Sequence, residues 1–224
     1  MVRVWLPDRP GALGAVASRI GALRGDVVGI EILERGAGRA VDELVVQLPE
    51  SGLVDLLVQE ITQVDGVDVE DVREVADALH DPRLDALETA AQLVAATNAD
   101  DLLEALCTHA ARSIGAEWAV VVDLDQVDVL AGVGPAPSAG WLSAFVAGSR
   151  SSARVVALET GPDDVVWAPL AGANLALVMG REGQAYRARE RRSAAALARI
   201  ADTRFRELSA AASRACHPAG STRG

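Results

Sequence analysis

Apolar and polar residues follow two different periods in the first third of the chain, and together they predict six short elements. Apolar residues recur at helical spacing from Leu13 to Leu23 and from Leu53 to Ile61. Four other runs have the short, apolar character of β-strands: Val2–Leu6, Val27–Glu34, Ala40–Leu48 and Val67–Val75. The order βαββαβ predicts a ferredoxin-like α+β domain over residues 1–76, in which two helices cover one face of an antiparallel sheet.

The pattern changes after Asp77–Arg83, a polar segment with a proline that we interpret as a linker. Residues 84–213 are expected to form a second, α/β domain with flanking helices. Helical spacing fills Leu84–Ile114, with a break at which Asn98 can cap a new helix. The long closing helix is Tyr186–Ser213, and residues 214–224 are expected to be a disordered tail. The predicted strands and the short helix between them are Glu117–Asp123, Val127–Val133, Ser138–Ser149 (helix), Arg154–Leu158, Val165–Leu170 and Leu175–Gly180.

Charge and composition exclude several classes of function. The formal net charge of −11 disfavours a nucleic acid or an anionic membrane as the main partner. Every basic residue is an arginine, so Schiff-base catalysis and a phosphate-binding P-loop, which both need a lysine, are excluded. No apolar run approaches the roughly 20 residues that span a bilayer. The start of the sequence has no secretion-signal pattern either, so we expect a cytoplasmic protein.

Residues that could support catalysis or bind a metal are sparse. The chain has 3 histidines and 2 cysteines, and Cys107 and His109 stand two apart on a predicted helix, where they face different directions. We therefore expect no catalytic site, no metal site and no cofactor, and interpret the protein as a non-enzyme. Trp118, Trp141 and Trp167 could line a pocket, but aromatic residues that stand alone in strands and helices are more often core residues, and we expect core positions for them.

The segment Asp8-Arg9-Pro10-Gly11-Ala12-Leu13, between the first strand and the first helix, is the main candidate site. If Pro10 occupies the first helical position, the N–H groups of Gly11, Ala12 and Leu13 are free at the positive end of the helix dipole. A carboxylate could approach them closely, because Gly11 has no side chain. Asp8 could accept an ammonium group, so the loop suits a zwitterionic amino acid. The simpler interpretation is that Asp8 caps the helix and Pro-Gly makes a turn.

This D-R-P-G-x-L motif, after a first strand and within βαββαβ order, resembles the signature of ACT domains over roughly residues 2–75. The resemblance implies a homodimer that pairs through its second strands and binds an amino acid or related metabolite at the interface. It also implies a regulated protein partner. The residues it implies are Asp8, Arg9, Gly11, Ala12 and Leu13 of one chain, with Val27, Val28, Gly29 and Ile30 of the other.

Residues 86–208 are similar in element order to GAF domains, although no motif supports the likeness. The combined prediction is a regulatory amino-acid-binding protein that passes a signal from an ACT-like domain to a GAF-like domain. The alternative is an ACT-like module that binds no ligand and serves only for dimerisation or interaction with a partner protein.

Overall fold

A computed structural model describes residues 1–75, 82–151 and 163–216 of the chain. The chain forms two compact units. We call the unit within Met1–Asp81 the N-terminal unit; the C-terminal unit comprises Pro82–Tyr186 and Glu190–Gly224. Each unit contains a four-stranded antiparallel sheet and its own apolar core, so the protein is a mixed α+β protein.

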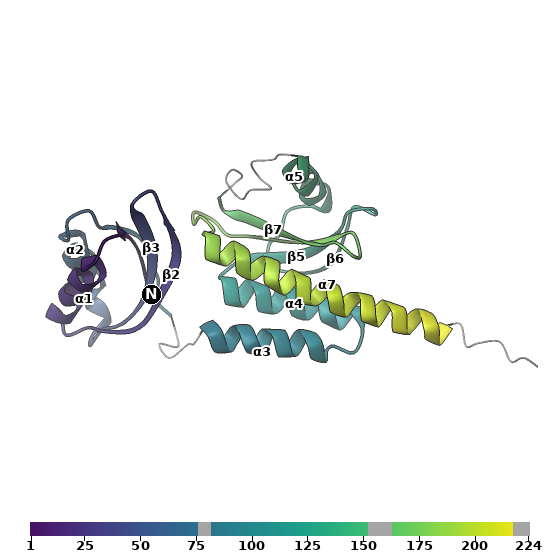
Figure 1. The fold of residues 1–224 in the computed structure, drawn as a ribbon, viewed down its shortest axis with the longest axis horizontal. Coiled ribbons are helices and arrows are strands. Elements are labelled where there is room, and N and C mark those ends of the chain that lie inside the picture. Colours follow the sequence, from purple (N-terminus) through teal and green to yellow (C-terminus); the bar gives the residue numbers. More distant parts are fainter. Residues whose placement is uncertain (76–81, 152–162, 217–224) are drawn as a thin grey trace, which may run out of the picture. The chain divides into compact units, whose positions relative to one another are not determined.

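The N-terminal unit has the expected βαββαβ order, with a short 3₁₀ turn, Ser51–Leu53, before its second helix. Its sheet has the strand order β2-β3-β1-β4, which leaves β2 and β4 at the edges. Both helices lie on the same face of this sheet (Figure 1). The elements are β1 (Val2–Pro7), α1 (Ala12–Ala22), β2 (Asp26–Gly36), β3 (Arg39–Gln47), α2 (Val54–Thr62) and β4 (Asp68–Val72).

Every second side chain along β1 points into the core of the N-terminal unit. Val2, Val4 and Leu6 are buried towards the helices, because side chains two apart on a strand share a face. On α1, Val16 and Ile20 are fully buried against them. The other buried residues of this core are Ala12, Ala40, Leu44, Leu57, Ile61 and Val67.

The C-terminal unit begins with two helices and ends with a long one. The side chain of Asn98 caps the second of these helices by accepting a hydrogen bond of 2.9 Å from the amide of Asp101, as the sequence predicted. The sheet has the order β6-β5-β8-β7. The elements are α3 (Pro82–Ala95), α4 (Ala99–Ile114), β5 (Trp118–Asp123), β6 (Asp128–Val133), α5 (Ala139–Ser151), β7 (Val165–Leu170), β8 (Leu175–Gly180) and α7 (Ala188–Cys216).

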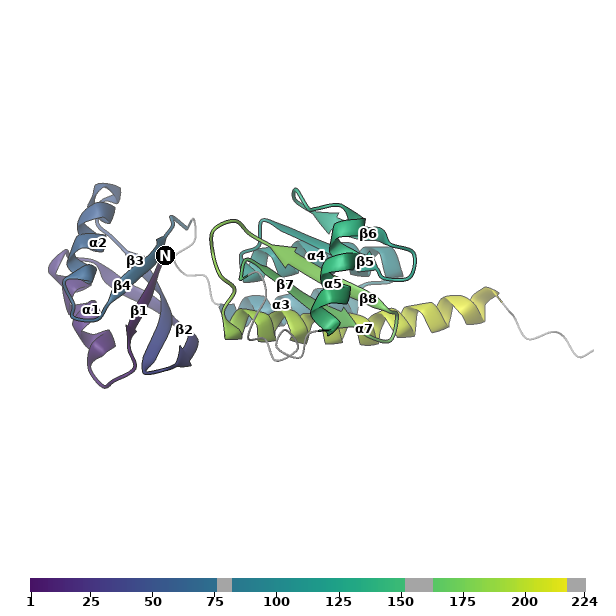
Figure 2. The same cartoon turned by 90° about the horizontal axis from the view of Figure 1, so that it is seen from above.

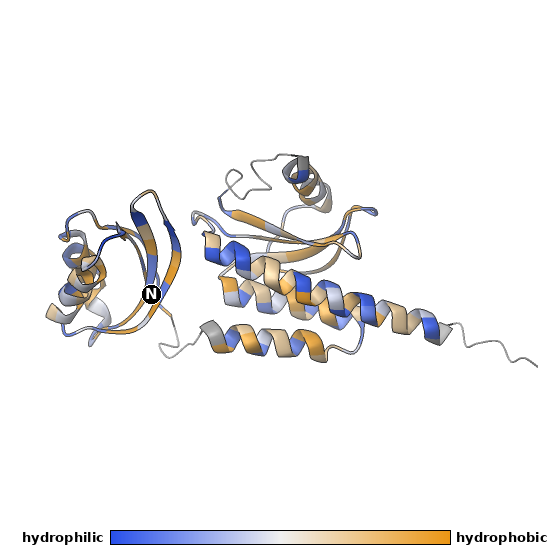
Figure 3. Ribbon diagram, viewed as in Figure 1, coloured by the Kyte–Doolittle hydropathy of each residue, from blue (hydrophilic) through white to orange (hydrophobic). Residues whose placement is uncertain are grey.

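Helices cover both faces of the second sheet: α5 lies on one face, and α4 and α7 lie on the other, with α3 packed against α4 (Figures 1 and 2). The central strands β5 and β8 are therefore buried on both sides. Ala119 and Val121 face the three-helix side, whereas Val120 and Val122 face α5. This explains why these strands are continuous apolar runs rather than alternating ones. Figure 3 shows the contrast between these strands and α7, whose polar and apolar residues alternate around the helix.

The structure changes several predicted boundaries. Helix α3 already begins at Pro82, so the expected linker Asp77–Arg83 is shorter at its C-terminal end. Helix α7 continues to Cys216, beyond the expected start of the tail at residue 214. The predicted strand Arg154–Leu158 and the rest of the predicted tail, 217–224, lie outside the described residues. Trp118 is buried, but Trp141 is 45% exposed and stacks on Phe145, so the prediction of a core position for Trp141 is wrong.

Candidate functional site

The loop between β1 and α1 is a tight turn that ends in a left-handed residue. Gly11 has φ +89° and is the N-cap of α1, so the helix starts at Ala12. Pro10 thus precedes the cap, and its predicted position at the first helical residue is wrong. The reason is the αL conformation of Gly11, which a residue without a Cβ adopts readily and which delays the helix by two residues.

Two of the three predicted free amides remain unpaired. The amide of Ala12 donates to the carbonyl of Arg9 over 3.3 Å, a long bond that closes the turn, so this amide is not free. Within the described part of the chain, the amides of Gly11 and Leu13 have no hydrogen-bond acceptor. They lie at the N-terminal end of an 11-residue helix, where the backbone dipoles favour an anion.

Asp8 does not cap the helix. No side chain accepts a hydrogen bond from the first turn of α1, which contradicts the simpler interpretation of Asp8 as an N-cap. The backbone of Asp8 is fixed instead by a 2.9 Å hydrogen bond from its amide to the carbonyl of Gly38, in the β2–β3 turn. Asp8 and Arg9 are both exposed, so their side chains are available to a ligand at this loop.

A buried carboxylate near the loop was missed by the sequence reasoning. Asp42, on β3, is 3% exposed, and its Oδ1 has no hydrogen-bond partner. Burial raises the pKa of Asp42, the nearby charge of Asp8 raises it further, and the charge of Arg35 lowers it. The signal was present in the sequence, since Asp42 falls on the same face of its strand as Ala40 and Leu44, where an apolar residue is expected.

The second half of the implied site lies on the edge strand β2. Val27 packs on the core, whereas Val28 and Ile30 are 37% and 52% exposed. Gly29 leaves room for Val45, because a Cβ at Gly29 would approach Val45 Cγ2 to 3.2 Å. Ile32, 38% exposed, extends the exposed apolar row.

Within one chain the two halves of the implied site are not brought together. Asp26 pairs with Gln47 at one end of the β2–β3 ladder, and Gly36 pairs with Arg39 at the other. Pro7, which leads into the ligand loop, also pairs with Arg39. The loop therefore lies at the far end of the sheet from Val27–Ile30.

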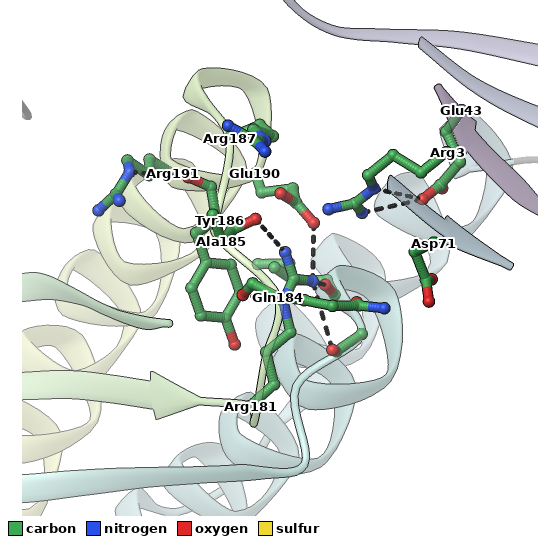
Figure 4. A network of polar contacts seen from close by, with 12 residues as sticks. Arg3, Glu43, Asp71, Arg181, Gln184, Ala185, Tyr186, Arg187, Glu190 and Arg191 are labelled. Carbon is green, nitrogen blue, oxygen red and sulfur yellow. Dashed lines mark hydrogen bonds and ion pairs between the residues drawn. The ribbon is translucent and has the colours of Figure 1, made fainter. Parts of the chain in front are cut away.

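Other polar clusters in the two units have structural roles. On the N-terminal sheet, Arg3 Nε and Nη2 donate to Glu43 Oε2 over 3.2 and 2.9 Å, across the β1–β3 ladder (Figure 4). In the C-terminal unit, Arg181 is buried and forms an ion pair of 2.8 Å with Glu190. The same guanidinium also donates to the carbonyls of Ile114, Gln184 and Ala185 (Figure 4).

Arg181 therefore ties the end of α4 to the segment that precedes α7. Its guanidinium also lies 4.0 Å from the ring centroid of Tyr186. With its nitrogens engaged in this way, Arg181 stabilises the fold rather than offering a free cation.

Groups that could serve as a nucleophile or a metal ligand are few in the described residues. Burial raises the pKa of Cys107 to about 12, so its thiol is protonated at neutral pH. His109 lies on the same helix but is only partly buried, so the two residues face different surroundings. No group of three or more His, Cys, Asp or Glu side chains that could hold a metal is found in the ranges that the structure covers. Among the helices described, none has the length and apolar character needed to cross a membrane.

Comparison with known proteins gives no assignment. No protein-family model matches this sequence, and no curated protein matches it significantly.

Proposed function

We propose that the protein is a homodimeric regulatory protein that binds an amino acid, or a closely related metabolite, at the β1–α1 loop of an ACT-like N-terminal unit. The observation that carries this proposal is the pair of unpaired amides of Gly11 and Leu13 at the start of α1. Backbone amides at a helix N-terminus bind carboxylates through both hydrogen bonding and the helix dipole. The exposed carboxylate of Asp8, in the same turn, supplies a partner for the ammonium group of the ligand.

A second copy of the chain would complete the site. Strand β2 is an edge strand with an exposed apolar row, Val28, Ile30 and Ile32, and such an edge readily pairs with another strand. If two β2 strands pair antiparallel about their middle, near Glu31, residue Val27 of one copy comes opposite Arg35 of the other. That arrangement brings Val27–Ile30 to the end of the sheet that carries the ligand loop of the second copy.

The proposed role is binding and regulation rather than catalysis. A ligand held between two copies would favour one dimer arrangement over others, in proportion to its difference in affinity for them. The C-terminal unit, which we propose to be GAF-like, would receive this change and act on a protein partner.

The second candidate is a module that dimerises without a ligand. The exposed apolar row on β2 favours it, because this row needs only a second copy to be covered. The two candidates make different predictions for the ligand loop, since only the first requires Asp8.

Calorimetric titration of the full chain with each of the twenty amino acids tests the proposal. We expect at least one to bind, and Asp8→Ala to weaken that binding while the dimer mass measured by light scattering stays unchanged. Absence of binding by all twenty, together with an intact dimer, would favour the second candidate.

A further inference from the structure

Three charged side chains gather at the end of the N-terminal sheet that carries the ligand loop. Asp42 pairs with Val4 on one side and with Ile32 on the other, so it lies between β1 and β2, on the face that the helices cover. Arg35 pairs with Ala40, two residues from Asp42 and on the same face. Asp8 follows β1 at this end, and its charge acts on Asp42.

Asp42 is the member of this group whose charge is poorly compensated. It is 97% buried, given its 3% exposure, and Oδ1 has no hydrogen-bond partner. The charge of Arg35 favours the ionised form of Asp42, but Arg35 is exposed and forms no ion pair with Asp42 within the described residues. Burying a carboxylate with an unpartnered oxygen costs free energy, and such a group is a candidate for contact with a positively charged group of a ligand.

We propose that Asp42 is a ligand-binding residue, whose buried carboxylate pairs with the ammonium group of an amino acid held at the start of α1. This inference rests on the proposed function and adds a second polar contact between the protein and the ligand. The amides of Gly11 and Leu13 take the carboxylate of the ligand, and the ammonium group is directed inwards, towards β3.

The surroundings make Asp42 a better acceptor than Asp8. Asp8 is exposed, where water and salt weaken an ion pair, whereas Asp42 lies in a region of low dielectric. Arg35 is exposed and forms no ion pair with Asp42 within the described residues, so its long side chain is available to the ligand carboxylate. The ligand class is therefore narrowed to molecules that carry a free, positively charged amine beside a carboxylate.

Two sets of titrations with the full chain test this inference. The first compares each amino acid that binds with its N-acetyl derivative, which keeps the carboxylate and loses the positive charge. The second compares wild type with Asp42→Asn, and with Asp55→Asn as a matched control. Asp55 is an exposed carboxylate on α2, so this control makes the same change of charge away from β3. Circular dichroism of each variant establishes that it is folded.

We expect Asp42→Asn to weaken amino-acid binding by about tenfold to a hundredfold, as the loss of one charge-assisted hydrogen bond predicts. Asp55→Asn should bind like wild type, and the N-acetyl derivative should lose at least as much affinity as Asp42→Asn does. Equal binding by folded Asp42→Asn and wild type overturns the inference and leaves the proposed function standing. Absence of binding by wild type to all twenty amino acids overturns both.

Discussion

Replacing Asp42 with asparagine should make the protein more stable at neutral pH. The wild-type residue buries a carboxylate whose Oδ1 has no partner, and burial raises its pKa above the ordinary value of 3.8. Folding therefore holds the charged form of Asp42 in surroundings that disfavour it. Asparagine has nearly the same shape and no charge, so the variant removes this penalty without creating a cavity.

The size of the effect follows from the burial of this one group. A buried polar group without a hydrogen-bond partner costs about 1–3 kcal/mol. Asparagine still places polar atoms at this position, so we expect a gain near the lower limit, about 1 kcal/mol. For a unit of the size of Met1–Asp81, that corresponds to a rise in Tm of roughly 4–8 °C.

The gain should depend on pH in a defined direction. Below the unfolded-state pKa, Asp42 is protonated in both states and its burial does not lower the free energy of unfolding. Because the folded-state pKa of Asp42 is raised, the wild-type protein loses stability as the pH rises from the unfolded-state pKa through the folded-state pKa. Asp42→Asn does not titrate at this position, so its advantage over wild type should be small near pH 4 and largest above pH 7. Other carboxylates titrate in both proteins and cancel in the difference.

Urea unfolding of the two full-length proteins at several pH values, followed by circular dichroism, measures this difference. Asp55→Asn is the control, and we expect it to lower stability slightly, because it removes an exposed negative charge from the first turn of α2. The reasoning would be refuted if Asp42→Asn were less stable than wild type at pH 7.5. It would also be refuted if the difference in the free energy of unfolding between the two proteins were the same at pH 4 as at pH 7.5.

Three further substitutions test other parts of the account. Ile30→Asp, on the exposed row of β2, should convert the proposed dimer to a monomer by light scattering, whereas Leu56→Asp, at a 40% exposed apolar residue on α2, should leave the mass unchanged. Arg181→Leu should lower the free energy of unfolding by about 3–5 kcal/mol in urea titrations, because it removes the guanidinium that pairs with the buried carboxylate of Glu190. A loss below about 1 kcal/mol would contradict the structural role of Arg181. Gly134→Ala should lower the free energy of unfolding by roughly 3 kcal/mol in the same assay, since φ of Gly134 is +77° and a Cβ would clash with the backbone before β5. The control Gly140→Ala, in open space on α5, should leave the free energy of unfolding unchanged. Equal effects of the two substitutions would contradict this argument.

The elements with a clear period were predictable from the sequence. In the N-terminal unit the short β-type runs such as Val2–Leu6 and the helical spacing from Leu13 predicted the order of strands and helices that the structure shows. The cap at Asn98 was predictable for a local reason, since asparagine followed by an amphipathic run is typical of a helix start. Local sequence patterns were sufficient to predict both features.

The details of the candidate site depend on contacts that local patterns do not contain. Pro10 matched a first helical residue equally well, and only the αL conformation of Gly11 shifted the helix start to Ala12. The place of Asp42 on the apolar face of its strand was visible in the sequence, but its full burial depends on how β3 lies between its neighbours. Trp141 was misplaced for a similar reason, since its helix presents that side chain outwards.

The most direct test of the central claim observes the amides themselves. Backbone amide resonances of Gly11 and Leu13, assigned by nuclear magnetic resonance, should shift strongly when an amino acid that binds is added, because their N–H groups acquire a carboxylate acceptor. The same two amides should exchange more slowly with solvent in the bound state. If an amino acid binds while both amides keep their resonances and exchange rates, the start of α1 is not the ligand site.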